Sequence, residues 1–309
     1  MFYNCENCFD PDDDPTKNDD DYTPQGARHW TSFRQWQKLM NLAQVVVAAG
    51  GGIAPAVVGL AEVENDSVML RLTQQTPLRE WEYHYVMTHC QDVRGINVAL
   101  MYQPLDFRLL GWSSVRVTLP EGSRPTRDLL HAWGRVVGGD TLDVVVCHLP
   151  SRRGGVRQSA HNRQAAHRTI AHLCDSLQQL RRRPHVLVMG DMNDTPDTRQ
   201  LQADMHFGQR LTNLMEPIQR DLNRGRRAMG THKYDGVWGV LDQFWVNDGL
   251  SQPESGMWVD GADVLALPFM LTEDATHMGH RPLRSYYGNK YEGGYSDHLP
   301  IILNLHICY

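Results

Sequence analysis

The stretch that decides the fold is Val186-Leu187-Val188-Met189-Gly190-Asp191, followed by Met192 and Asn193. Four apolar residues in succession predict a short buried strand. Asp191 and Asn193 stand where this strand ends. A lone charge is expensive inside a protein, so an acid at this position indicates chemistry rather than packing.

Short apolar runs elsewhere in the chain also end, or begin, at a polar residue that a buried sheet does not need. If these strand ends lie at one edge of the fold, they form a single cluster of carboxylate, imidazole and amide groups. With the two residues above, the predicted members are Asn4, Glu6, Glu62, His148, Asp191, Asn193, Asp242, Asp297 and His298.

The composition of this cluster predicts a divalent-metal site. Oxygen ligands dominate and no cysteine is among them, which suits Mg²⁺ or Mn²⁺ better than Zn²⁺. Carboxylates and imidazoles that do not bind the ion are free to accept or donate protons. A metal ion together with such groups is typical of phosphate ester hydrolysis, where positioning and charge neutralisation provide most of the catalysis.

Basic residues accompany two of the expected site segments. Arg152 and Arg153 follow His148 closely, in Ser-Arg-Arg-Gly-Gly, and a second basic loop spans 224–233 before Asp242. Glycine lets the backbone approach a phosphate and arginine offers a fork of donors. We expect Arg152 and Arg153 to bind the substrate phosphate; the alternative is an ordinary surface turn.

Composition and charge exclude several classes of protein. The chain has 309 residues, 41% of them hydrophobic, and a net charge of −6. These values exclude a fully disordered chain and a protein that coats nucleic acid by bulk attraction. The longest uncharged apolar stretch, 45–61, contains glycines and a proline and is short for a bilayer span, so no stable membrane insertion is expected. The six cysteines lack paired CxxC spacing, which favours buried thiols.

Two long helices are expected. The first covers 31–49, capped by Thr31 or Ser32, with Phe33, Trp36, Ala43 and Val47 among its buried residues. The second covers about 157–180. Its buried face would hold Ala166, Ile170, Leu173, Leu177 and Leu180, with Arg163, Arg168, Gln178 and the histidines 161, 167 and 172 in solvent. No internal repeat or low-complexity linker occurs, so we expect one domain over 1–309.

Seven segments, in the same order along the chain, resemble the motifs of the endonuclease/exonuclease/phosphatase superfamily. Their residues are similar to those of a bacterial branch of this superfamily. They are FYNCEN at 2–7, GLAEVEN at 59–65, RGINVALMY at 94–102, CHLPSRRGG at 147–155, GDMND at 190–194, LDQFWV at 241–246 and GGYSDHLP at 293–300. The resemblance implies a four-layer α/β sandwich, with two packed mixed β-sheets and helices on both outer faces.

The resemblance also implies roles for the cluster. Glu62 would be the main metal ligand, with Asn4, Glu6 and Asp297 as further ligands. His148, Asn193 and His298 would contact or protonate the scissile phosphate, Asp191 would orient or deprotonate the attacking water or bind the metal, and Asp242 would orient His298.

These observations predict a Mg²⁺- or Mn²⁺-dependent phosphodiester hydrolase, of which a nuclease acting on DNA or RNA is the leading form. The alternatives are a phospholipid or inositol phosphate hydrolase of the same fold and a phosphate-binding module without catalysis. We expect a monomer whose partner is its phosphodiester substrate. The chain starts as a strand rather than a signal peptide, yet the bacterial branch often carries an export signal, so an extracytoplasmic location is expected.

Overall fold

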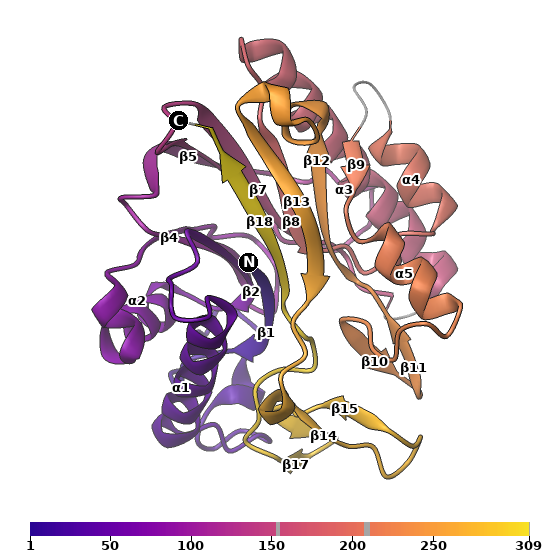
Figure 1. The fold of residues 1–309 in the computed structure, drawn as a ribbon. Coiled ribbons are helices and arrows are strands. Elements are labelled where there is room, and N and C mark those ends of the chain that lie inside the picture. The colour runs from indigo at the N-terminus through magenta and orange to yellow at the C-terminus, as the bar shows by residue number, and fades with distance from the viewer. Residues whose placement is uncertain (153–154, 207–210, 309) are drawn as a thin grey trace.

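Two six-stranded mixed sheets pack face to face in the computed structural model, which describes residues 1–152, 155–206 and 211–308 (Figure 1). The first sheet has the order β13(Met257–Val264), β18(Ile301–Ile307), β1(Phe2–Cys8), β2(Val57–Val63), β4(Asn97–Tyr102), β3(His84–Met87). The second has the order β5(Phe107–Val115), β6(Leu129–Val136), β7(Thr141–His148), β8(Val186–Asp191), β12(Asp242–Asn247), β9(Leu211–Asn213).

Strand β8 shows why the molecule has layers. Its side chains alternate: Leu187 and Met189 belong to the core between the two sheets, while Val186 and Val188 belong to the core beneath the helices. Successive strand residues point to opposite faces, so a strand that is apolar at every position is covered on both sides. The continuous apolar run in the sequence is therefore explained by two separate cores.

Helices cover both outer faces of the sheet pair. Figure 1 shows α1(Ser32–Ala49) and α2(Asp66–Gln75) on one side, and α3(Val156–Leu180), α4(Arg199–Met205) and α5(Glu216–Asn223) on the other. The expected four-layer α/β sandwich is thus confirmed.

Three small hairpins lie near one end of the sandwich. They are β10(His232–Tyr234) with β11(Val237–Gly239), β14(Leu271–Glu273) with β15(His280–Pro282), and β16(Tyr286–Tyr287) with β17(Lys290–Tyr291). We call residues 271–291, which hold the last two hairpins, the flap. Short 3₁₀ turns complete the description: Asp20–Tyr22, Pro77–Trp81, Asp248–Leu250, Pro253–Ser255 and Pro268–Met270.

The first long helix has the expected bounds, but its buried face is only partly the expected one: Ala43 is buried as predicted, while other positions differ. Thr31 caps it, its hydroxyl accepting from the Arg34 amide. Phe33 and Trp36, expected in the core, are 69% and 50% exposed. The buried face instead includes Lys38 and Asn41, whose amino and amide groups donate to carbonyls of residues 293–295. Polar partners that lie far away in the sequence therefore determine which face of the helix is buried, and the helix sequence alone does not reveal them.

The second long helix, α3, departs from expectation for the same reason. Its apolar residues Ala166, Ile170 and Leu177 are buried as predicted, whereas Leu180 is exposed. Arg163, His167 and Gln178, expected in solvent, are buried. Arg163 pairs with Asp194, and His167 lies near Asp204. Acidic partners on the segment after β8 and on α4 thus accompany the burial of Arg163 and His167, and Gln178 accepts from the Asn247 side chain.

Two expectations from composition can be compared with the structure. Five cysteines are buried free thiols, as predicted, and Cys308 is exposed. Within the described ranges, no helix is both long and apolar enough to cross a bilayer.

Candidate active site

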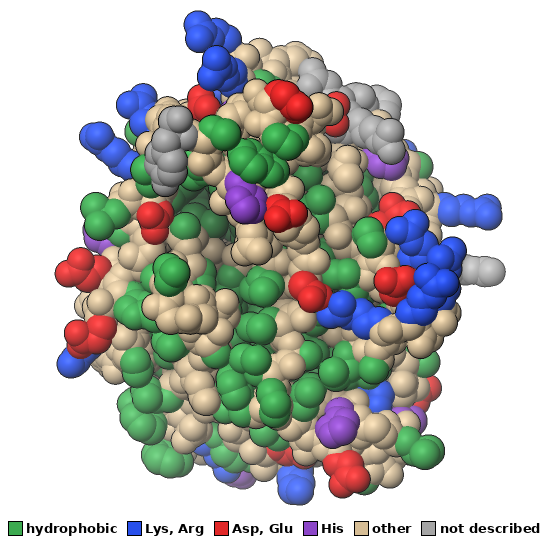
Figure 2. Space-filling view, viewed as in Figure 1, with side chains coloured by type: hydrophobic (Ala, Val, Ile, Leu, Met, Phe, Trp, Pro, Cys, Tyr) green, Lys and Arg blue, Asp and Glu red, His purple; other side chains and the backbone are tan. Residues whose placement is uncertain are grey.

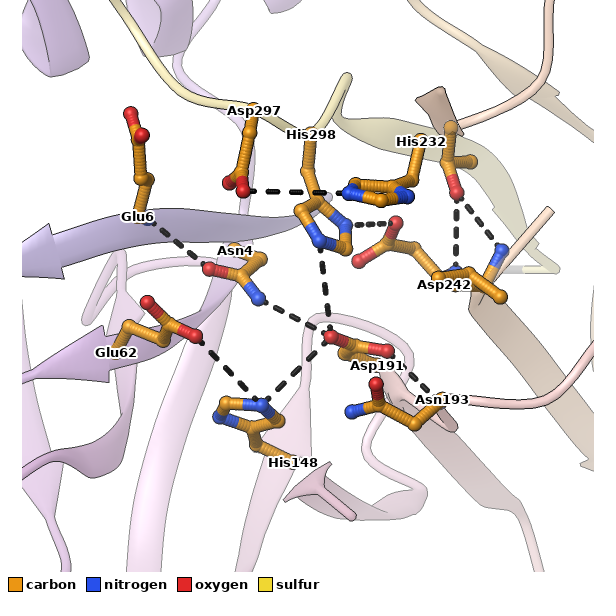
Figure 3. A network of polar contacts seen from close by, with 12 residues as sticks. Asn4, Glu6, Glu62, His148, Asp191, Asn193, His232, Asp242, Asp297 and His298 are labelled. Atoms are coloured by element: carbon orange, nitrogen blue, oxygen red, sulfur yellow. Dashed lines mark hydrogen bonds and ion pairs between the residues drawn. The ribbon is translucent and has the colours of Figure 1, made fainter. Parts of the chain in front are cut away.

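The strand ends converge because of the strand directions. β1 runs parallel to β2, and β7 runs parallel to β8, so within each sheet the carboxyl ends of the pair share an edge. β12 is antiparallel to β8 and begins opposite its end. β18 is antiparallel to β1 and begins opposite Phe2, so the residues just before β18, among them Asp297 and His298, lie alongside the later part of β1. Figure 3 shows the resulting cluster, into which both sheets send side chains.

Register places three residues of the second sheet side by side. His148 lies opposite Asp191, and Asp191 lies opposite Asp242, at the ends of β7 and β8 and the start of β12. From the first sheet, the Asn4 amide donates to Asp191 Oδ2 at 3.1 Å (Figure 3). Asn4 thereby links the two sheets at the centre of the cluster.

Backbone irregularities aim the two glutamates of the first sheet. The pairing of β1 with β2 shifts between Asn4 and Cys8, and that of β2 with β4 shifts between Ala61 and Val63. At these shifts Glu6 has a φ of 51° and Glu62 a φ of 61°. Such conformations cost of order 1–3 kcal/mol each and concentrate at functional sites. The bulges re-aim side chains that regular strands would direct elsewhere.

Asp242 fixes the orientation of His298. Its Oδ2 lies 2.7 Å from His298 Nδ1, and the Asp242 amide donates to the Thr231 hydroxyl. Burial alone would lower the pKa of His298, but Asp242, Asp191 and Asp297 together raise the pKa of that imidazole well above its ordinary value. His298 is therefore a cation at neutral pH, with Nε2 directed toward Asp191 at 3.8 Å.

Asp191 is the most connected member of the cluster. Its Oδ1 accepts from the backbone N–H of Asn193 at 2.8 Å. Its Oδ2 accepts from the side-chain amide of Asn4 and faces both His148 and His298. Burial raises the pKa of Asp191 to about 6, despite the opposing effect of His298. A carboxylate with such a pKa is ionised at neutral pH and is a stronger base than an exposed aspartate.

His148 stays neutral although it lies among carboxylates. Its Nε2 is 3.7 Å from Asp191 and 3.8 Å from Glu62, while Nδ1 is buried without a partner among the described residues. Burial and the nearby guanidinium of Arg127 hold the pKa of His148 well below its usual range. Arg127, whose Nε donates to the His148 carbonyl at 3.0 Å, also fixes the end of β7. Sequence reasoning did not identify Arg127.

The donor atoms fit an oxygen-preferring divalent cation. Glu62 Oε2 accepts from the backbone N–H of Asn7 at 2.7 Å, while Glu62 Oε1 faces the cluster, 3.8 Å from Nε2 of His148. Within the described residues, Asn4 Oδ1 accepts one hydrogen bond, from the Glu6 backbone amide, and so keeps a second lone pair. Two further groups have donor atoms within 4.8 Å of one another: Asp191 with Asp242 and His298, and His232 with Asp297 and His298. Together, these carboxylate and amide oxygens suit Mg²⁺ or Mn²⁺.

Glu6 and Asp297 share a cation that the chain itself provides. Arg284, from the flap, donates to Glu6 at 3.1 Å and to Asp297 at 2.8 Å. The second Glu6 oxygen accepts from the Ser285 amide at 2.7 Å and lies 3.8 Å from Lys38. Burial would raise the pKa of Asp297, but Arg284 and His298 outweigh it and lower that pKa to about 2. Both oxygens of Glu6 are thus engaged, so Glu62 and Asn4 have more freedom to bind a metal.

The structure places Arg152 in a supporting network. Its guanidinium donates to the Asn193 carbonyl and to Asp194, each at 2.8 Å. Asp194 also binds the buried Arg163, and the side-chain amide of Asn193 donates to the Leu149 carbonyl. Arg152 therefore braces the turn after β8 in addition to any contact with phosphate. Arg153 lies outside the described residues.

In the second basic loop, two cations have acidic partners away from the cluster. Arg227 pairs with Asp263, and Lys233 pairs with Asp274. Arg224 and Arg226 are exposed. The described contacts thus connect this loop to neighbouring strands.

His232 belongs to the cluster but was not predicted. It opens β10, and its ring centroid lies 4.6 Å from that of His298; Nε2 is 4.0 Å from Asp297 (Figure 3). Burial, followed by the charge of His298, lowers the pKa of His232 to about 4. The sequence signal was the Asp235-Gly236 pair, which is typical of a two-residue hairpin turn and would have placed His232 on a strand shortly before Asp242.

A comparison with protein families covers nearly the full length of the chain. The family model described as Endonuclease/Exonuclease/phosphatase family matches residues 1–307. The chain belongs to the endonuclease/exonuclease/phosphatase family. No protein of curated function matches the sequence at a significant level.

Solved structures of endonuclease/exonuclease/phosphatase proteins share the fold at low identity. The human Nocturnin catalytic domain with bound sulfate has a TM-score of 0.59 and 16% identity, covering 88% of this chain and 87% of its own. A mannosyl-6-phosphatase of Bacteroides thetaiotaomicron has 0.59 and 15%, covering 89% and 93%. D. rerio TDP2, complexed with a single-strand DNA product, has 0.57 and 14%, covering 87% and 93%. At these identities the likeness concerns the fold.

Proposed function

We propose that this chain is a divalent-metal-dependent phosphodiester hydrolase, and that its substrate is DNA or RNA. The observation that carries the proposal is the arrangement of Asp191 between His298, which Asp242 orients, and the neutral His148. Such a set provides a base and two N–H donors around one phosphate. A cation bound by Glu62, with Asn4 and Asp297 as further candidates, would neutralise phosphate charge and polarise the phosphorus–oxygen bonds.

The short distance between Asp191 and His298 limits their roles. In an in-line displacement, the attacking and leaving oxygens lie on opposite sides of phosphorus. His298 Nε2 is 3.8 Å from the Asp191 carboxylate, so both groups face the same side. We therefore assign Asp191 to the attacking water, whose proton it accepts, and His298 to a nonbridging phosphate oxygen. The ester oxygen leaves on the far side and takes its proton from solvent.

In this proposal His148 provides the second phosphate contact, and Asn193 orients Asp191. A neutral His148 can donate one N–H to a second nonbridging oxygen without having to lose a proton. Asn193 has a φ of 51°, and its backbone donates to Asp191, which keeps the carboxylate directed into the cluster. Arg152 holds this turn in place through the Asn193 carbonyl.

The region 253–292 favours nucleic acid over a lipid surface. A membrane-binding hydrolase would need an apolar hairpin that projects from the fold. In the region 253–292, Met257, Val264 and Met270 are instead buried, and Leu267 and Phe269 pack against the core. Among the described residues of this region, the exposed large apolar side chains are Met278, at 85%, and Tyr287, at 43%. Two such side chains are a poor membrane anchor.

The substrate class can be tested with a panel. Supercoiled plasmid, single-stranded RNA, sphingomyelin vesicles and an inositol polyphosphate are incubated with the protein in Mg²⁺, Mn²⁺ or EDTA. The proposal predicts metal-dependent cleavage of plasmid or RNA. Hydrolysis of the lipid or inositol substrate alone would overturn the nuclease assignment, and phosphate binding without turnover of any substrate would indicate a binding module.

A further inference from the structure

A cavity of about 380 Å³ adjoins the candidate active site. Residues of the β10–β11 hairpin line one part of it and residues of the flap line the other. Its wall includes Asp297 and Arg284 from the cluster, and Tyr234, Arg281 and Tyr287 beyond it. Its volume falls within the range of roughly 300–1,000 Å³ found for small-molecule sites. A group bound here would be adjacent to the reacting phosphate.

The hairpin and the flap are fixed to each other. Lys233 Nζ lies 2.7 Å from Asp274 and donates to the carbonyls of Met278 and His280. At the hairpin tip, Gly236 has a φ of 78°, and an added Cβ there would lie 2.9 Å from the Cβ of His277. The backbone of the tip is therefore packed directly against the flap, and the cavity between them is already formed.

Two tyrosines of the cavity wall are exposed to an unusual degree. Tyr234 is 78% exposed and Tyr287 is 43% exposed. The Arg281 guanidinium lies 4.3 Å from the centre of the Tyr287 ring and is held there by two hydrogen bonds to Glu292. Aromatic rings and arginine planes are the surfaces on which nucleobases stack.

We propose that this cavity holds the nucleobase of a nucleotide joined to the scissile phosphate, stacked on Tyr234 or Tyr287. This inference rests on the proposed function. The charges of the wall favour a base over a second phosphate, because Lys233, Arg281 and Arg284 already have carboxylate partners. Exposed aromatic surface is what the cavity offers instead.

Two substrates that differ only in the base test this proposal. One is thymidine 5′-(p-nitrophenyl phosphate); the other is the same diester of 1,2-dideoxyribose, which lacks the base. The wild-type protein should favour the thymidine diester in kcat/KM by about five- to a hundredfold. Tyr234→Ala or Tyr287→Ala should remove most of this preference by lowering kcat/KM for the thymidine diester much more than for the abasic diester, and the Phe variants should retain the preference.

Trp112→Ala provides the matched control, since Trp112 is a 42% exposed aromatic on β5 that does not line the cavity. Equal rates on both diesters, or a preference that survives both Ala variants, would overturn the nucleobase assignment while leaving the hydrolase assignment intact. If neither diester is cleaved, the proposed function fails, and calorimetric titration with thymidine 5′-monophosphate tests the nucleobase site alone. Binding that is weakened by Tyr234→Ala and Tyr287→Ala supports the nucleobase site. Binding that neither variant weakens, or the absence of binding, contradicts it.

Discussion

Asp242 Oδ2 lies 2.7 Å from Nδ1 of His298, and this contact leaves Nε2 of the same imidazole directed toward Asp191. One carboxylate thus fixes the orientation of the ring and also raises the pKa of His298. The second oxygen of Asp242 is buried without a hydrogen-bond partner among the described residues.

Asp242→Asn should lower kcat by about 10²–10³-fold, the usual cost of losing one positioned donor to a reacting oxygen that carries charge. It should also move the alkaline limb of the pH–rate profile to lower pH. The sign follows from the raised pKa of His298: protonation persists to high pH in the wild type, and removing the charge of Asp242 lowers that pKa. The matched control is Asp248→Asn, an exposed aspartate just after the far end of β12. An alkaline limb unchanged in Asp242→Asn would contradict the assignment.

Glu62→Gln should weaken divalent-cation binding by at least about tenfold, because an amide oxygen replaces the carboxylate that faces the cluster. Calorimetric titration with Mn²⁺ measures this without reference to turnover. Glu80→Gln, at a glutamate whose side chain is 69% exposed, is the control. An affinity equal to that of the wild type would exclude Glu62 as a principal ligand.

Arg163→Met should destabilise the fold. Arg163 is 2% exposed and its Nε lies 2.7 Å from Asp194, so the variant leaves a buried carboxylate with one cation fewer. Breaking a buried pair costs about 3–5 kcal/mol, and the lower end is expected because Arg152 still binds Asp194. Urea unfolding measures the change. Arg168→Met, at the 58% exposed arginine of the same helix, should change stability little; equal effects of the two substitutions would be inconsistent with a buried pair.

Arg284→Gln should reduce stability at neutral pH more than at low pH. The lowered pKa of Asp297 means that this carboxylate stabilises the fold above the ordinary value of 3.8, and that its contribution disappears as pH falls toward about 2. Without Arg284, Asp297 and Glu6 lose a shared partner, so the variant should approach the wild type as both acids become protonated. Unfolding curves across this range test the claim; a pH-independent difference would count against it.

Local patterns in the sequence predicted short buried strands that end in polar residues, as in the run 186–191, which ends in an acid. The four-layer arrangement was implied by the family resemblance, and the convergence of the strand ends was a hypothesis that the structure confirms. The placement of Arg163, Lys38 and Arg284 could not be predicted in this way. Each is held by a partner distant in sequence, such as Asp194 for Arg163 and Glu6 for the other two. Charge alone predicts solvent exposure for such residues, and only the tertiary pairing reverses it.

The central claim is that one cluster, centred on Asp191, hydrolyses phosphodiesters. The most direct measurement is the rate of bis-p-nitrophenyl phosphate hydrolysis in Mg²⁺, Mn²⁺ and EDTA for the wild type, Asp191→Ala, His298→Ala and the control Asp248→Asn, each shown to be folded by circular dichroism. The account predicts turnover that requires metal, persists in the control and is lost in both cluster variants. Turnover that survives in Asp191→Ala, or none in folded, metal-loaded wild-type protein, would contradict it.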